Sequence, residues 1–159
     1  MTKKLLSCAV LFSAAVLPAC TSSNTIRTSA NTAIVRTSAA PICGGTGAAR
    51  VAQEQAAIET IKSGYDRYII VDAASANNVQ VVEGPGTFNH RGVYNGGSYS
   101  GTTTYQPGIP VIRGRHEQAF GIRMFRDGEP GAQQAISARQ MLGDTWEEIV
   151  KTGGAKTCA

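Results

Sequence analysis

Apolar residues recur with two different periods along the middle of the chain, and together these periods predict a mixed α+β domain. Between residues 47 and 63, apolar side chains return every three or four residues, which is the spacing of one face of an α-helix. β-Branched residues are concentrated in 33–38 before this helix and in 68–71 after it, which predicts two strands. Strand, helix and strand within about forty residues form a βαβ-like unit. We expect Thr46 to cap the start of the helix and Gly64 to end it.

Residues 73–115 are polar and rich in Gly, Thr and Tyr. Asn95-Gly96 separates two segments of high strand propensity, and Asn-Gly is a strong short-range signal for a tight β-hairpin turn. Neither arm of this hairpin alternates well between apolar and polar residues, so we predict a solvated hairpin instead of core strands. Three tyrosines either form an aromatic face for a protein or glycan partner or pack across the strands of a two-stranded ribbon. They are Tyr94, Tyr99 and Tyr105.

The C-terminal part predicts one more strand and two helices. Apolar and other side chains alternate from His116 to Arg126, as in a strand. Pro130 suits the first turn of a helix that continues to Gly143, and Asp144 with Glu147 three residues later resembles a capping box. The predicted fold is therefore a small single α+β domain with a strand–helix–strand unit, a Gly/Tyr-rich β-hairpin and C-terminal helices.

The N-terminal end of the chain follows a different pattern. Lys3 and Lys4 precede an apolar run from Leu5 to Val16, and small residues follow the run. This order is typical of a secretory signal, and the run is shorter than the ~20 residues that a membrane-spanning helix needs.

Leu17-Pro18-Ala19-Cys20, at the end of this signal, resembles the lipobox of bacterial lipoproteins. The resemblance implies that residues 1–19 are removed and that Cys20 carries diacylglycerol and a further acyl chain such as palmitate. Two or more acyl chains anchor a protein stably to a membrane. Pro18 departs from the usual pattern, and ordinary cleavage with a soluble product is the alternative. Thr21 stands where an Asp would favour inner-membrane retention in enterobacteria, so the resemblance points to the periplasmic face of the outer membrane.

Removal of the signal leaves a chain that suits one domain. Residues 20–32 have almost no apolar content, so we predict that the lipidated cysteine begins a flexible tether and that the folded domain spans 33–159. The loss of Lys3 and Lys4 lowers the net charge from +4 to +2. The remaining basic residues are scattered, which argues against a nucleic-acid partner.

Lipidation of Cys20 also limits what the four cysteines can do. Cys8 lies in the discarded signal, so Cys43 and Cys158 remain in a compartment that oxidises thiols. We predict a Cys43–Cys158 disulfide that ties the C-terminal end to the start of the folded domain. A catalytic thiol or a metal site is the alternative, but two cysteines without a supporting His cluster make a poor zinc site.

Few residues could carry catalysis. His90 lies in the Gly-rich region, and His116 is followed by Glu117, whose side chain points to the opposite face of a strand. The sequence contains no motif for a catalytic centre, a cofactor or a metal. Arg113 and Arg115 lie close to the hairpin and could add a basic patch to the tyrosine surface.

Beyond the lipobox, the chain resembles small uncharacterised envelope lipoproteins of alphaproteobacteria. The resemblance rests on the cysteine, the polar tether, the Ala-rich helix and the segment Gly64-Tyr65-Asp66-Arg67-Tyr68-Ile69-Ile70-Val71. It is structural and transfers no functional residue. We expect a non-enzymatic cell-envelope lipoprotein that binds an envelope protein or the cell wall. The alternative is an envelope hydrolase that uses His116 with a carboxylate.

Overall fold

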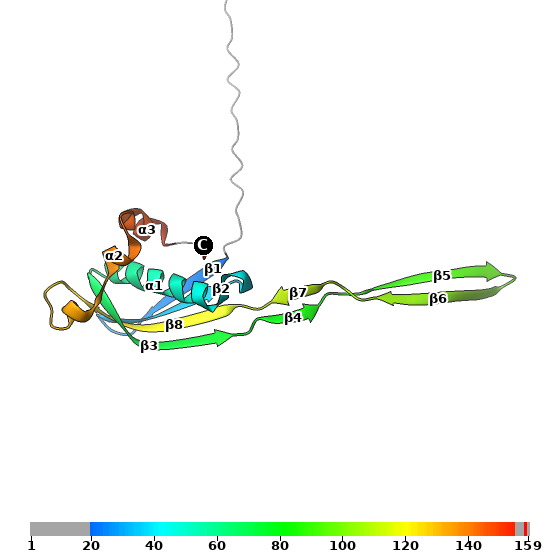
Figure 1. Ribbon diagram of the computed structural model, residues 1–159, viewed down its shortest axis with the longest axis horizontal. Coiled ribbons are helices and arrows are strands. Elements are labelled where there is room, and N and C mark those ends of the chain that lie inside the picture. The colour runs from blue at the N-terminus through cyan, green and yellow to red at the C-terminus, as the bar shows by residue number, and fades with distance from the viewer. Residues whose placement is uncertain (1–19, 155–157, 159) are drawn as a thin grey trace, which may run out of the picture.

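The computed structural model describes residues 20–154 and residue 158, and shows a body from which a long β-ribbon projects (Figure 1). The body is a five-stranded antiparallel sheet with the strand order β1-β2-β8-β3-β9. Its strands are β1 (Thr21–Arg27), β2 (Thr32–Ala39), β3 (Arg67–Asn77), β8 (His116–Phe125) and β9 (Ile136–Ser137). The predicted α+β class and the single small domain are confirmed. The signal peptide predicted at 1–19 lies outside the described residues.

The strand–helix–strand unit is present, but its two strands are not neighbours. Both β2 and β3 pair antiparallel with β8, which lies between them. They are therefore parallel to each other, and the helix between them, α1 (Gly44–Lys62), crosses over one face of the sheet (Figure 1). A strand from later in the chain thus completes the unit, which local periodicity could not reveal.

Helix α1 begins earlier than predicted. A short 3₁₀ turn, η1 (Pro41–Cys43), leads directly into it, so Cys43 and not Thr46 occupies the N-cap position. The C-terminal end is as predicted, because Ser63 is the C-cap and Gly64 follows with φ 79°, a left-handed angle that glycine adopts without strain.

Small side chains let α1 lie close to the sheet. Ala52, Ala56 and Ala57 are fully buried, and Ile58 beside them reaches a core that includes Tyr68, Ile122 and Met124. The Tyr68 hydroxyl donates a hydrogen bond to the Gln53 carbonyl at 3.2 Å. Burial raises the pKa of Tyr68 to about 12, so the phenol stays neutral and keeps this bond at any ordinary pH.

The tether predicted over residues 20–32 is wrong for most of its length. Thr21–Arg27 forms β1, an edge strand that pairs with β2 from Thr21↔Ala39 to Arg27↔Ala33. An edge strand exposes most of its side chains, and here nearly all of β1 outside Thr21 is exposed. Its Ser- and Thr-rich composition is therefore compatible with a strand as well as with a linker.

The helix predicted from Pro130 to Gly143 is also wrong in its first half. Gly131 has φ 92°, and the chain then forms a 3₁₀ turn, η2 (Ala132–Gln134), and the short strand β9 before α2 (Ala138–Leu142) begins. Pairing of Ile136 with Tyr68 of β3 prevails over the local helical pattern. The last helix, α3 (Trp146–Thr152), starts after Thr145 without a side-chain cap, so the predicted capping box is absent.

The predicted disulfide is confirmed. Cys43 and Cys158 are joined with their Cα atoms 5.6 Å apart, across a sequence separation of 115 residues. Gly47 lies against the bridge, because a Cβ atom there would stand 3.1 Å from the Cβ of Cys43 and 3.3 Å from that of Cys158. The bridge therefore holds the C-terminal end of the chain against the first turn of α1.

Candidate interaction surface on a projecting β-arm

The most unusual feature of the molecule is a two-stranded arm, which we define as residues 78–115. It continues β3 and β8 beyond the body, first as β4 (Gln80–Glu83) with β7 (Pro110–Arg113) and then as β5 (Thr87–Asn95) with β6 (Ser98–Gln106) (Figure 1). At ~3.3 Å per residue, the strand path from residue 78 to residue 95 is roughly 60 Å long. Every residue of β5 and β6 is exposed, so the predicted solvated hairpin is confirmed.

The turn at the tip of the arm lies one residue later than the Asn-Gly signal suggests. Asn95 pairs with Ser98, and the two residues between them, Gly96 and Gly97, have φ 57° and φ 89°. The tight two-residue turns that match the twist of a β-hairpin require positive φ at both central residues. Glycine adopts positive φ without strain.

The pairing of β5 with β6 gathers four aromatic side chains on one face of the ribbon. Phe88 is opposite Tyr105, and Tyr94 is opposite Tyr99. Because successive strand residues point to opposite faces, positions six apart share a face, and these two pairs lie six residues apart on both strands. We call this side the aromatic face. The prediction included the tyrosines but missed Phe88, which the equal six-residue spacing could have identified.

The two rings of each pair lie close to one another and remain open to solvent. The centroids of Phe88 and Tyr105 are 4.9 Å apart, and those of Tyr94 and Tyr99 are 6.4 Å apart. Between 51% and 75% of the surface of each of these residues is exposed. Cross-strand packing and an exposed aromatic surface, which the sequence posed as alternatives, are therefore both present.

Glycines lie directly beneath two of these rings. A Cβ atom on Gly92 would collide with Cζ, Oη and Cε2 of Tyr99, and one on Gly101 would collide with Oη and Cε1 of the same ring. A Cβ atom on Gly86 would likewise collide with the end of the Tyr105 ring. The rings of Tyr99 and Tyr105 therefore lie flat against the ribbon, over glycines that have no side chain.

The arm is joined firmly to the body at its root. The Arg115 guanidinium donates to the Ser38 hydroxyl at 2.6 Å and to the Cys20 carbonyl at 3.4 Å, and its backbone amide donates to the Asn78 side chain at 2.6 Å. Arg115 is therefore half-buried against the body, and Arg113 lies in β7, separated from the Phe88 pair by roughly 25 Å of strand. The structure does not bring either arginine to the aromatic face.

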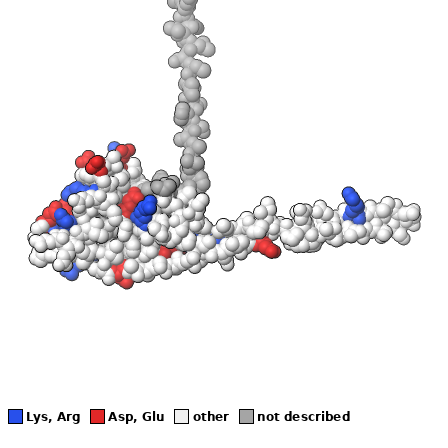
Figure 2. Space-filling model, in the orientation of Figure 1, with Lys and Arg blue, Asp and Glu red and all other residues white. Residues whose placement is uncertain are grey.

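Charge is concentrated on the body and is sparse along the arm (Figure 2). Between residues 78 and 114 the charged side chains are Glu83, Arg91 and Arg113. Of these, Arg91 is the one in β5, and it pairs with Thr102 on the face opposite the aromatic rings. The aromatic face therefore carries no Asp, Glu, Lys or Arg side chain.

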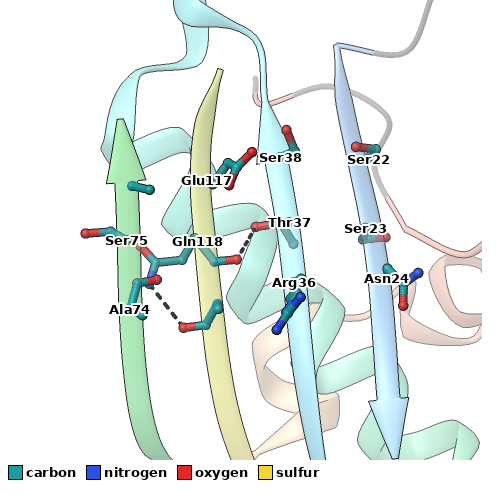
Figure 3. A pocket seen from close by; sticks show the side chains of 12 residues that line it. Ser22, Ser23, Asn24, Arg36, Thr37, Ser38, Ala74, Ser75, Glu117 and Gln118 are labelled. Carbon is teal, nitrogen blue, oxygen red and sulfur yellow. Dashed lines mark hydrogen bonds between the residues drawn. The ribbon is translucent and has the colours of Figure 1, made fainter. Parts of the chain in front are cut away.

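A hollow lies on the sheet face away from α1, with a volume of about 690 Å³ (Figure 3). Arg36 and Glu117 are its charged groups, and its other lining residues are small or polar. These are Ser22, Ser23, Asn24, Thr37, Ser38, Ala74, Ser75, Ala76, Gln118 and Ala119. Of these, the Gln118 amide already donates to the Ala74 carbonyl at 2.9 Å. The hollow is an open polar trough with no histidine and no paired carboxylates.

The two histidines lie far apart. His90 is on the arm, where Nδ1 is 2.8 Å from the Thr103 hydroxyl, and His116 is opposite Asn77 at the edge of the body. Roughly 40 Å of strand separates these positions. Among residues 20–154 and 158, neither histidine contacts a carboxylate and no cluster of His, Cys, Asp and Glu suits a metal ion. The hydrolase alternative therefore has no assembled acid–base pair in the described chain.

No protein-family model, curated protein or solved structure matches this chain. In the part of the chain that the structure describes, no helix has the length and apolar character needed to cross a membrane.

Proposed function

We propose that this chain is a non-enzymatic binding module of the bacterial cell envelope, held by lipid at Cys20, and that the aromatic face of its arm contacts the partner. The observation that carries the proposal is the arm itself. An isolated two-stranded ribbon is marginally stable in water, and this one exposes four aromatic rings on one side. A contiguous exposed apolar surface on a soluble protein is typical of an interaction site.

The body supports this division of roles. Its core lies between α1 and the sheet, and the strands of the arm make their main contacts with one another. The arm therefore adds little to the folding of the body, while it carries side chains far from it. A rigid body with a projecting contact element suits a protein that bridges its anchor and a partner.

The anchoring half of the proposal predicts a simple fractionation result. Cys20→Ala moves the protein from the membrane fraction to the soluble fraction or stops its processing, because the lipid is attached at this residue. Cys43→Ala, which removes a cysteine of the disulfide instead, leaves the membrane association unchanged. Detergent extraction and immunoblotting of both variants measure this. A Cys20→Ala protein that is processed and stays in membranes contradicts the lipid anchor.

The binding half predicts a face-specific crosslink in cells. A photo-reactive phenylalanine analogue at Tyr94, on the aromatic face, yields a discrete adduct. The same analogue at Val93 yields none, because adjacent strand residues point to opposite sides. Both positions are exposed on β5, so reactivity and access are matched. Equal adducts from the two positions, or no adduct from Tyr94, would show that the aromatic face is not the contact surface.

A further inference from the structure

We infer that the partner of the aromatic face is a polysaccharide, the glycan strand of the cell wall. This inference rests on the proposed function, since it names the chemistry of the partner at the same surface. Its basis is the composition of the face, the way the rings lie and the distance between the two ring pairs.

The composition of the aromatic face differs from that of a typical protein contact. Its eight positions are occupied by aromatic rings, glycine, histidine and threonine, with no Leu, Ile, Val or Met among them. They are Phe88, His90, Gly92, Tyr94, Tyr99, Gly101, Thr103 and Tyr105. A protein interface core is enriched in Met and Arg as well as in aromatic residues, and a membrane-bound face carries Leu beside its aromatic residues, whereas this face has none of the three. Rings alternating with hydrogen-bonding groups match sugars, which present C–H faces and hydroxyl edges.

The rings are also placed as platforms. One side of the Tyr99 ring covers Gly92 and Gly101, so its other side faces outward, and 61% of the residue is exposed. Tyr105 covers Gly86 in the same manner and contacts Phe88. The face of an aromatic ring carries negative charge density, which attracts the weakly positive C–H groups on one side of a sugar ring. A ring that stood upright would offer its edge instead.

The two ring pairs are spaced for an extended ligand. Six residues separate Phe88 from Tyr94 and Tyr99 from Tyr105, which places the pairs roughly 20 Å apart along the ribbon. Between them, the His90 ring and the Thr103 hydroxyl form a polar pair that can also bond sugar hydroxyls. Each stacking contact is weak, but two on one ribbon bind a single long strand with a gain in avidity.

Charge favours a neutral polymer over an acidic one. The aromatic face has no arginine or lysine, which a phosphate-rich ligand would require. Arg91 points away from it, and the root arginine Arg115 is engaged with Ser38. For a protein held by lipid in the periplasm, as proposed above, the wall glycan is a polymer within reach of the arm.

Cosedimentation with intact cell-wall sacculi tests the inference, with soluble N-acetylglucosamine oligomers or stem peptides as competitors. The wild-type protein sediments with the sacculi, the sugar oligomers release it and the stem peptides do not, and albumin does not sediment. Gly92→Ala weakens the binding about tenfold, because the new methyl group lifts Tyr99 off the ribbon while every aromatic side chain remains. The φ angle at Gly92 is one that alanine adopts, so the backbone is retained. Val93→Ala, on the opposite face, binds as the wild type does.

Three outcomes would overturn the inference. They are a failure of the wild type to sediment, release by stem peptides and not by the sugar oligomers, and full binding by Gly92→Ala in a protein with an unchanged unfolding transition. A protein adduct from the Tyr94 crosslink together with no sedimentation would contradict a glycan partner and leave the proposed binding function standing. The absence of both the adduct and the sedimentation would contradict the glycan inference and the proposed binding function together.

Discussion

Replacing Cys43 and Cys158 together with serine lowers the free energy of unfolding of the body by about 3–5 kcal/mol. The bridge spans 115 residues, so the reduced chain gains a large amount of conformational freedom when it unfolds. The Gly153-Gly154 segment after α3 adds little rigidity of its own, so the C-terminal end also loses its attachment to the first turn of α1. Urea unfolding followed by circular dichroism measures the change.

Two controls separate this effect from general damage. A reducing agent brings the wild type to the stability of the double variant and leaves the double variant unchanged. Cys20→Ser, in a soluble form of the protein, unfolds at the same urea concentration as the wild type, because the side chain of residue 20 takes no part in the bridge. A loss below about 1 kcal/mol for the double variant would mean that the closed loop contributes little to the stability of the body.

Removing the arm abolishes partner binding and leaves the body folded. The variant replaces residues 79–114 with the dipeptide Asn-Gly, so that a two-residue turn connects Asn78 to Arg115. These two residues already exchange hydrogen bonds at 3.3 Å and 2.6 Å, so a tight turn can close the gap without moving β3 or β8. The free energy of unfolding changes by no more than about 1 kcal/mol, because the lost residues bury little surface against the core.

The armless variant is compared with a full-length variant in which the four rings of the aromatic face are replaced by serine. Both lose binding to the sacculi, while both retain the disulfide and a cooperative unfolding transition. Full binding by the armless protein would move the contact surface to the body, where the trough beside Arg36 and Glu117 would be the next place to look. An armless body that fails to fold would show that the arm supports β3 and β8.

The parts of the fold that local patterns determine could be predicted, and the parts that depend on distant pairing could not. The three- and four-residue spacing in α1 reflects its packing against the sheet, and the cysteine pair follows from counting. The position of β8 between β2 and β3 depends on contacts between residues some eighty positions apart, which no periodicity records. Gly131 and the pairing of Ile136 with β3 redirect the chain where the sequence looks helical.

The candidate surface was predictable in outline and not in detail. The hairpin and its tyrosines follow from the Gly-rich turn and the strand propensities. The presence of four rings on one face depends on the register, which the turn at Gly96 and Gly97 sets. The place of Arg115 could not be read from the sequence, because its bonds to Ser38 and Cys20 join segments that the fold alone brings together.

The position of Cys20 has a mechanical consequence. Thr21, Ala39, His116 and Asn77 form one row across the sheet, so Cys20, the proposed attachment point of the lipid, and the root of the arm lie at the same end of the body. In a lipid-anchored protein, tension between membrane and arm tip is carried at this end, where β1 separates from β2 one pair at a time while α1 lies off the line of force. Once β1 is released, residues 20–31 can span up to roughly 40 Å. Unfolding of strand β1 would then lengthen the connection between the lipid and the body. The arm could stay bound to a partner whose distance from the membrane varies.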